Sequence, residues 1–471
     1  MRRQPPCRRP LRALVAGAVT TVALAAGCAL NPPPDREALN AEAFGAMVPP
    51  AAWSATSAGG GPVADGWVSA FDDPRIAPLV EEALANNPDL RAAAVQVDRA
   101  AAQLRIAGGG VYPAVNLIGR TSTSEGSGAE PLNAGILSAS WELDVWGRVR
   151  YGRRAAQDQY AVVENDYAYA RQSLAALVVR SWLVACEATL QSALAADSLA
   201  GAGKLLELAE ERQRVGIGSE IDVALARASR DDFRDALRRL ELARGQSLRA
   251  LELLLGRYPS AELAAARALP GLVADAPAGV PAELLERRPD VVAAGRRVAA
   301  AFSRTGEARA ARLPRITLSG SVSYLDSDLL VLKQRDDPVW GLGLGLVMPL
   351  YAGGALEGQV ELRTAEQKAA VAQYASTGLK AFGEVESALA GELAALDRIG
   401  ILASQVRDRD RALELEQVRY RVGNADLRAV TQQQLALYAS RSALLRMQAE
   451  RLSQRVGLYL ALGGNFAEAA S

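Results

Sequence analysis

Two stretches of the chain alternate apolar residues with small or polar ones. In residues 316–324, Ile, Leu, Gly, Val and Tyr alternate with Thr and Ser, and in residues 340–348, Trp, Leu and Met alternate with Gly and one Val. A weaker alternation in residues 137–144 follows the segment 114–122 across a loop rich in Ser and Gly. A period of two residues is typical of a β-strand with two different faces. The chain is therefore predicted to contain two β-hairpins, each with one apolar face and one small or polar face.

Each predicted hairpin is followed by a long run of helix-forming residues. Proline is absent from residues 132–258 and from the chain after Pro349, and these runs are rich in Ala, Leu, Glu, Arg and Gln, which all favour helices. We expect helices over residues 148–214 and 355–422, each about 67 residues or roughly 100 Å long. Because globular helices usually run about 10–14 residues, helices of this length must pack against others along their whole length.

A nearly identical phrase ends each long helix, RQRVG at residues 212–216 and RYRVG at residues 419–423. Glycine suits the end of a helix where the chain reverses. Ser219 or Asp426 can then accept the first hydrogen bonds of a returning helix. Each phrase is therefore predicted to mark the tip of a helical hairpin.

The repeated phrase belongs to a tandem duplication of the chain. Pro88-Asp89 recurs as Pro289-Asp290 at an offset of 201 positions, and the glycine of the phrase recurs at an offset of 207. The offset is steady within each segment and changes only where a loop could differ. The chain therefore contains two copies of one unit, about residues 79–259 and 281–465, with a period far longer than that of solenoid repeats.

Each copy is expected to open with a shorter helix, over residues 79–107 in the first copy and 281–310 in the second. The returning helices are expected to end near Gly256 and Gly463, after about 38 residues each. An opening and a returning helix together have nearly the length of one long helix. This equality is what two short helices stacked end to end beside one long helix would require.

The N-terminus has the features of a secretory signal, with arginines at positions 2, 3, 8, 9 and 12 and an apolar stretch over residues 11–28. The stretch is too short and too poorly flanked for a membrane-spanning helix. Its end, Ala25-Ala26-Gly27-Cys28, resembles a bacterial lipobox, with Leu24 four places before the cysteine instead of three. That resemblance implies lipidation of Cys28 and, with Ala29 next to it, delivery to the outer membrane. The alternative is a plain signal peptide with a coincidental cysteine.

These observations divide the chain into six segments. They are a lipoprotein signal peptide (1–27), an extended N-terminal segment at the equator of the helices (28–78), the first repeat (79–259), a linker (260–280), the second repeat (281–465) and a C-terminal tail (466–471).

Composition excludes several classes of function. The chain has no histidine, which excludes histidine-based catalysis and histidine metal sites. Two of its three cysteines, Cys7 and Cys28, lie in the leader, so Cys186 has no obvious partner for a disulfide or a zinc site. Lys+Arg and Asp+Glu are equal at 53 each, so no net charge attracts nucleic acid. No cofactor and no metal are expected.

The predicted strands raise a geometric problem if they enter a membrane. Strands of about 9–11 residues can span a bilayer, but the smallest membrane barrels need about eight of them, and open strand edges are not tolerated in lipid. Several chains must then share one barrel, with the Gly and Ser faces lining a wet lumen and the Trp, Leu and Ile faces against lipid. The alternative is an ordinary half-exposed antiparallel sheet packed on helices.

Several motifs, in order and within the duplication, resemble the TolC-like outer-membrane efflux proteins, and more closely the lipoprotein branch typified by OprM and NodT. The motifs are WVSAFDDPRIAPLVEEALANNPDLRAAA (67–94), WELDVWGRVR (141–150), LLERRPDVVAA (284–294), PLYAGG (349–354) and YRVGNADLRAVTQQQLALY (420–438).

The resemblance implies an α+β membrane protein in which four strands per chain contribute to a trimeric, twelve-stranded outer-membrane β-barrel above a long periplasmic α-helical barrel. It implies a homotrimer, anchored by lipid in the bacterial outer membrane, that works with a periplasmic adaptor and an inner-membrane pump, usually of the resistance-nodulation-division type. Such a channel passively conducts drugs or toxic compounds that the pump exports. It catalyses no reaction.

The resemblance also assigns roles at the hairpin tips. It implies contact with the adaptor at the Val-Gly turns, which are Val215, Gly216, Val422 and Gly423. It implies a periplasmic gate held by charges and hydrogen bonds, for which the candidates are Arg212, Asp222, Tyr420, Asp426 and Arg428. The second copy departs from the family pattern, because Ala429 and Gln432 stand where the best-known members have aspartates.

Two other functions compete with a channel. A non-conducting envelope lipoprotein of long coiled coils would explain the helices and Cys28, but not the alternating strands with Gly-rich faces. A secreted hydrolase could use paired carboxylates, but the carboxylates here lie on repetitive helices.

Overall fold

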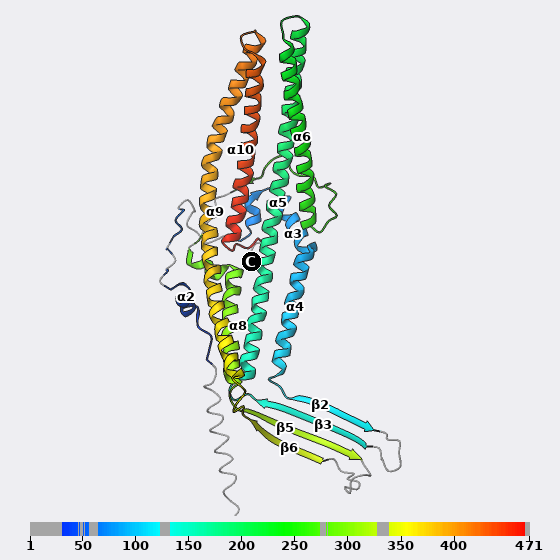
Figure 1. Ribbon diagram of the computed structural model, residues 1–471, viewed down its shortest axis with the longest axis vertical. Coiled ribbons are helices and arrows are strands. Elements are labelled where there is room, and N and C mark those ends of the chain that lie inside the picture. Colours follow the sequence, from blue (N-terminus) through cyan, green and yellow to red (C-terminus); the bar gives the residue numbers. More distant parts are fainter. Residues whose placement is uncertain are drawn as a thin grey trace, which may run out of the picture. The chain divides into compact units, whose positions relative to one another are not determined.

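The computed structural model describes residues 31–45, 47, 50, 52–55, 65–122, 132–273, 279, 281–326 and 339–466. The predicted signal peptide and Cys28 lie outside these residues. The helices are α2 (Arg36–Phe44), α3 (Ile76–Asn86), α4 (Pro88–Gly109), α5 (Arg148–Arg214), α6 (Glu220–Leu254), α7 (Leu284–Arg287), α8 (Pro289–Ala310), α9 (Ala355–Arg421) and α10 (Leu427–Ala461) (Figure 1). The strands are β1 (Phe71–Asp72), β2 (Ala114–Ser122), β3 (Leu132–Leu143), β4 (Gly271–Leu272), β5 (Arg315–Asp326) and β6 (Val339–Val347).

The longer helices have the same lengths in both copies of the repeat. The long helices α5 and α9 have 67 residues each, and the returning helices α6 and α10 have 35 each. The opening helices α4 and α8 have 22 residues each. In both copies the helix-forming composition favours these helices, and glycines at equivalent positions end the long and the returning ones.

The chain divides into two compact units that do not follow the two repeats. Unit 1 comprises the described parts of residues 1–47, 96–165 and 293–376, and unit 2 comprises those of residues 48–95, 166–292 and 377–471. Each unit takes segments from both repeats, and the long helices α5 and α9 contribute to both units.

Unit 1 contains one antiparallel sheet with the strand order β2-β3-β5-β6 (Figure 1). Sequence neighbours β2 and β3 pair, as do β5 and β6, so each repeat supplies one hairpin. The two hairpins join through β3 and β5, in a register that sets Trp141 opposite Leu318 and Ser140 opposite Ser319. The predicted hairpins are therefore confirmed, and they form a single sheet with β2 and β6 at its edges.

Unit 2 is mainly helical, with one short sheet of β1 and β4, and its core is built from the long helices and residues 67–83. Trp182 on α5 is 1% exposed, and its indole N–H donates to Oδ2 of Asp73 at 3.0 Å. Cys186, one turn along α5, is fully buried, and burial raises the pKa of its thiol to about 11. Both residues therefore serve in packing.

The opening helices are not continuous, which corrects the predicted spans 79–107 and 281–310. Asn87 and Arg288 have ψ angles of 124° and 120°, in the extended region, and each directly precedes a proline. A proline ring disfavours the helical conformation of the residue before it. The first opening helix is thus split into α3 and α4, and the second into α7 and α8.

Each of these breaks holds the end of a returning helix. The side chain of Asn87 donates from Nδ2 to the carbonyl of Leu254 at 3.0 Å, and Arg288 donates from Nη1 to the carbonyl of Ala461 at 3.1 Å. These two carbonyls occupy equivalent positions in α6 and α10. A helix leaves its last carbonyls without intrahelical partners, so the pre-proline residue supplies the missing donor in both copies.

Gly256 and Gly463 complete the same junctions. Their φ angles are 73° and 69°, and their N–H groups and those of the next residues bond back into the helix in the Schellman pattern. A Cβ added at Gly256 would lie 2.8 Å from the carbonyl oxygen of Asn86. Only glycine allows both the left-handed turn and the close approach of the opening helix.

Among the described residues, α5 is long and apolar enough to cross a membrane by length and composition alone, but 44% of that apolar window is buried. A buried core helix meets the same criterion, so this feature does not by itself indicate a membrane-spanning helix.

We predict that Gly256→Ala lowers the stability of the purified protein by more than about 1 kcal/mol, because a side chain is strained at positive φ and would collide with Asn86. The apparent melting temperature in detergent measures the effect. Gly400→Ala is the matched control, because Gly400 is an exposed position inside α9 with no atom within 4 Å of an added Cβ. The control should be neutral or stabilising by up to about 1 kcal/mol. Equal melting temperatures for the two variants would contradict the prediction.

Candidate functional site

The first hairpin tip is a glycine-terminated turn between α5 and α6. Gly216 has a φ of 82°, and the N–H of Ile217 donates to the carbonyl of Arg212 at 3.0 Å. The second tip repeats the arrangement, with Gly423 at the same φ and Asn424 donating to Arg419 at 2.8 Å. The Arg-x-x-Val-Gly phrase is therefore the signature of a helix C-terminus, as predicted.

The returning helices start with the two predicted N-caps. Ser219 accepts a hydrogen bond from the N–H of Asp222 at 3.1 Å, and the Asp222 carboxylate accepts one from the N–H of Ser219 at 3.5 Å. Asp426 accepts from the N–H of Ala429 at 2.9 Å. Both aspartates are thus engaged with the first turn of their own helix, where a negative charge is favoured.

Arg212 connects the two hairpins of unit 2. Its Nη1 donates to the carbonyls of Tyr420 and Arg421 at 3.2 and 3.3 Å, and its guanidinium carbon lies 4.8 Å from the centre of the Tyr420 ring. These contacts join the C-terminus of α5 to the C-terminus of α9. A cation is favoured at a helix C-terminus and over an aromatic face, so both interactions stabilise the same arrangement.

Tyr420 is the centre of the apolar core at the tips. It is 2% exposed and packs in a cluster with residues of α5, α6 and α10, namely Leu205, Leu206, Ala209, Val223, Ala226, Leu427 and Val430. Its hydroxyl is buried and has no hydrogen-bond partner within the described part of the chain. Burial, together with the negative charge of Asp222, raises the pKa of Tyr420, and Arg212 opposes this shift. The tyrosine is therefore neutral at physiological pH.

The structure brings together three of the five gate candidates: Arg212, Tyr420 and Asp222. The other two, Asp426 and Arg428, lie exposed at the start of α10. The four predicted adaptor-contact residues are exposed, and the side chains of Val215 and Val422 are 58% and 66% accessible. The contact of Arg212 with the other hairpin was not predicted, because it joins residues 208 positions apart.

Sequence reasoning also missed two buried arginines in unit 2. Arg455 on α10 is 2% exposed and pairs with Glu392 on α9 through a hydrogen bond of 2.9 Å. Arg288, equally buried, pairs with Asp290 and Glu384 at 2.8 and 2.6 Å. Such pairs fix the register of neighbouring helices because removing one partner leaves a buried charge uncompensated. Arg288 stands within a quoted motif, LLERRPDVVAA, but only the fold shows what it holds.

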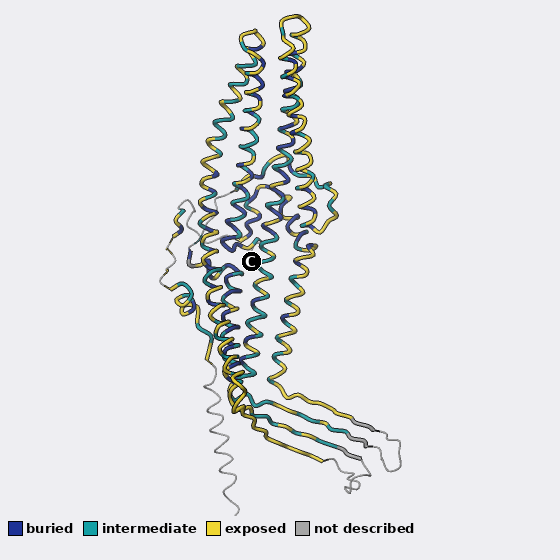
Figure 2. The backbone as a smooth tube through the Cα atoms, in the orientation of Figure 1, coloured by how far each residue is buried: buried dark blue, intermediate teal, exposed yellow. Residues whose placement is uncertain are grey.

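The sheet of unit 1 has the two different faces that the sequence predicts. The register places Ser138, Ser140, Ser319, Ser321, Gly341 and Gly343 on one face. It places Leu137, Trp141, Leu318, Val322, Leu344 and Trp340 on the other. On β6 every residue is exposed, including Leu342 at 84% and Leu344 at 69% (Figure 2). A row of accessible Leu and Trp side chains along an edge strand is a surface that requires a cover.

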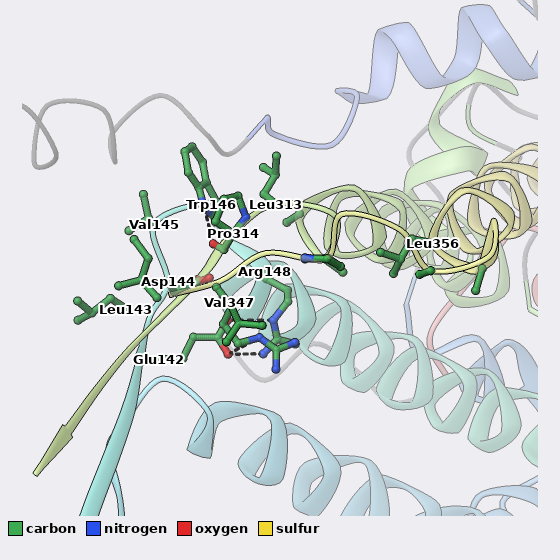
Figure 3. A pocket seen from close by; sticks show the side chains of 17 residues that line it. Glu142, Leu143, Asp144, Val145, Trp146, Arg148, Leu313, Pro314, Val347 and Leu356 are labelled. Carbon is green, nitrogen blue, oxygen red and sulfur yellow. Dashed lines mark hydrogen bonds and ion pairs between the residues drawn. The ribbon is translucent and has the colours of Figure 1, made fainter. Parts of the chain in front are cut away.

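The turn from the sheet into α5 is built by the motif WELDVWGRVR. Glu142 accepts two hydrogen bonds from Arg148, at 3.0 and 2.7 Å, and Asp144 accepts from the N–H groups of Val149 and Arg150 at 3.0 and 2.9 Å. Trp146 donates from its indole N–H to the carbonyl of Pro314 at 2.8 Å. These residues border a cavity of about 370 Å³ (Figure 3). The motif therefore fixes the direction in which the first long helix leaves the sheet.

Comparison with known proteins identifies the architecture. A family model described as outer membrane efflux protein matches residues 79–257 and 280–464. The chain is 31% identical over 439 residues to the pyoverdine export outer membrane protein OpmQ of Pseudomonas aeruginosa, covering 89% of this chain and 92% of that one. It is 28% identical over 409 residues to the cation efflux system protein CusC of Escherichia coli, covering 85% and 88%. The solved structure of the outer-membrane channel OprN matches with a TM-score of 0.79 at 26% identity, covering 89% of this chain and 99% of OprN.

We predict that Arg212→Ala loosens the tip, because it removes the only cationic group of α5 that bonds to the α9 carbonyls within the described residues. Hydrogen exchange of peptides spanning residues 413–430 should become about tenfold faster, as expected for the loss of about 1–2 kcal/mol of local stability. Mass spectrometry of the exchanged peptides measures this change.

Arg419→Ala is the matched control for that experiment. Arg419 holds the equivalent position in the second copy, but it pairs with Glu416 on its own helix at 2.8 Å and is 58% exposed. Exposed pairs of this kind contribute little, so exchange should change less than about twofold. If the two variants accelerated exchange equally, the cross-hairpin contact of Arg212 would have no special role.

Proposed function

Because the chain belongs to the outer membrane efflux protein family, whose members are the outer-membrane channels of tripartite efflux systems, we propose that three copies of it close one barrel and form a continuous passive conduit. The chain is the outer-membrane component, and it works with an inner-membrane pump and a periplasmic adaptor.

The observation that carries this proposal is the sheet of unit 1. It has four strands, two open edges, one apolar face and one face whose middle rows are mostly Ser and Gly. A strand edge exposed to lipid leaves several backbone groups without hydrogen bonds, each costing several kcal/mol. Pairing of β6 of one chain with β2 of the next removes every edge when three chains meet. The β6 and β2 strands are equally long at nine residues, which suits such a seam.

The two faces of the sheet then take opposite environments. In the proposed barrel the Leu and Trp residues of the apolar face contact the acyl chains, and the Ser and Gly residues line water. Small side chains on the inner face leave the lumen wide. A wide, wet lumen of this kind has little means of distinguishing solutes, so the pump would determine the cargo.

We assign the hairpin tips to the periplasmic entrance. The exposed turns at Val215, Gly216, Val422 and Gly423 are the proposed contacts for the adaptor. Arg212, Asp222, Tyr420, Asp426 and Arg428 are the proposed gate. The contact of Arg212 with Tyr420 supports this assignment, because separating the hairpins requires breaking it. The proposed inner-membrane partner is a pump of the resistance-nodulation-division type.

Mass in detergent and single-channel current in a planar bilayer test the shared barrel together. The mature protein should have the mass of a trimer and should produce discrete current steps. Folded monomers that never conduct would overturn the proposal and favour a periplasm-spanning scaffold without a channel.

We predict opposite outcomes for two arginine substitutions on adjacent rows of the sheet. Leu344→Arg places a charge on the proposed lipid face and should abolish trimer assembly in membranes, at a cost of about 2–4 kcal/mol per chain near mid-bilayer. Ser319→Arg places it on the proposed lumen face, where assembly should persist and conductance should fall. Leu344 is paired with Leu318, and Ser319 with Gly343, so both sites lie at the same depth. Equal loss of assembly in both variants would mean that the two faces share one environment.

We propose that Cys28 is lipidated and anchors the mature N-terminus. Intact mass of the purified protein should exceed that of residues 28–471 by a diacylglyceryl and an acyl group, and Cys28→Ser should lose that increment. The barrel strands should still retain the variant in the membrane, because one anchor adds only the burial of its acyl chains. If the wild-type protein instead begins at another residue and carries no lipid, Cys28 is not lipidated.

A further inference from the structure

The polar face of the sheet carries its described charges at one end only. Ser138, Ser140, Ser319, Ser321 and the glycines of β6 occupy its middle. Charged side chains gather where β3 ends and β5 begins, at Glu142 and Arg315. The register sets Glu142 opposite Thr317, and Arg315 is two residues from Thr317 on the same strand, so both belong to the polar face.

The basic groups of this cluster are not all held equally tightly. Glu142 receives both of its strong hydrogen bonds from Arg148, at 3.0 and 2.7 Å, and its side chain is only 20% exposed. Arg315 reaches the same carboxylate only at 3.7 Å, which is beyond hydrogen-bond distance, and its side chain is 55% exposed. Figure 3 shows Glu142 directed at Arg148 beside the cavity at the base of the sheet. The single carboxylate of Glu142 therefore faces two guanidinium groups. Of Glu142, Arg148 and Arg315, the most exposed side chain is that of Arg315.

The neighbouring charges at this end of the sheet are already neutralised. Asp144 pairs with Arg150 at 3.1 Å, and Arg312 pairs with Glu357 at 3.4 Å. Glu307 adds a further negative charge that acts on Arg148. Arg315 is thus the exposed cation of this cluster that, among the described residues, no carboxylate holds at hydrogen-bond distance, and it lies on the face that the proposed barrel turns toward water.

We propose that Arg315 is a selectivity-determining residue, which in the assembled channel forms a ring of three positive charges at the base of the barrel and favours anionic solutes over cationic ones. The inference rests on the proposed shared barrel with its polar face inward. Three copies of one exposed guanidinium, related by the symmetry of a trimer, face the same aqueous cross-section. Their fields add there, while Glu142 beside each of them is held by Arg148 and Asp144 by Arg150.

The strength of such a ring depends on ionic strength. The screening length is about 10 Å at 0.1 M salt and about 3 Å at 1 M salt. At 0.1 M salt the electric field of the three arginines extends into the lumen. At 1 M salt it is confined to the region close to the barrel wall. The preference for anions is therefore a low-salt property of the channel, and it bears on charge and not on the shape of the solute.

The test is the reversal potential of single wild-type and variant channels under a KCl gradient centred near 0.1 M. Arg315→Gln should lower the permeability ratio of chloride to potassium roughly twofold, and Arg315→Glu should lower it further. Arg315→Lys keeps the charge and should keep the wild-type ratio. The differences should disappear in about 1 M KCl, where screening is short.

The matched control is Arg312→Gln, which removes the same charge three residues earlier, before β5 begins, from a pair with Glu357. It should leave the ratio unchanged. Suppose that the channels conduct, but the ratio of chloride to potassium permeability does not change with the charge at position 315, or changes equally in Arg312→Gln. The assignment of Arg315 is then wrong, although the protein still forms a channel. If the wild-type protein forms no channel at all, the shared barrel fails, and the ring fails with it.

Discussion

The open edges of the four-stranded sheet are the constraint on which the rest of this protein depends. Among the described residues, β2 and β6 each pair on one side only, which leaves a row of backbone N–H and C=O groups without partners. In hydrocarbon such a row is far more costly than any single packing defect in the helices. The sheet is therefore stable in a membrane only as part of something larger. The apolar face of β6 supports the same conclusion, because its side chains are exposed in a single chain.

The helical part meets a different requirement, which is to keep two long hairpins in register. Glycines with positive φ end α5, α6, α9 and α10, and residues before proline divide the opening helices. These local signals fix the lengths, and they do so identically in both copies. Tertiary contacts then fix the sliding of one helix along another. Arg455 pairs with Glu392 on α9, and Arg288 pairs with Glu384 on α9, so a shift of α9 by one turn would break both pairs.

Sequence reasoning succeeded where the signal is local. The span 148–214 predicted for the first long helix is the observed one, and the second, predicted as 355–422, ends one residue earlier. The alternation in residues 316–324 and 340–348 gave both strands and their faces, and the motifs predicted the family. The helix breaks at Asn87 and Arg288 were not predicted, although each residue precedes a proline, which disfavours the helical conformation. The contact of Arg212 with Tyr420 could not be foreseen, because it depends on how two hairpins pack. The roles of the tip residues depend on neighbouring molecules that one chain does not contain.

The two copies of the unit have diverged most tellingly at the residue before the proline. Asn87 holds the end of α6 with a neutral amide, whereas Arg288 holds the end of α10 with a buried guanidinium that needs Asp290 and Glu384 as counter-charges. The first copy also has an aspartate after the proline, Asp89, but its asparagine needs no counter-charge. In the second copy Arg288 uses both the adjacent Asp290 and Glu384 of α9. The two halves thus share one backbone arrangement, while the same junction is closed by a neutral amide in one half and by a network of charges in the other.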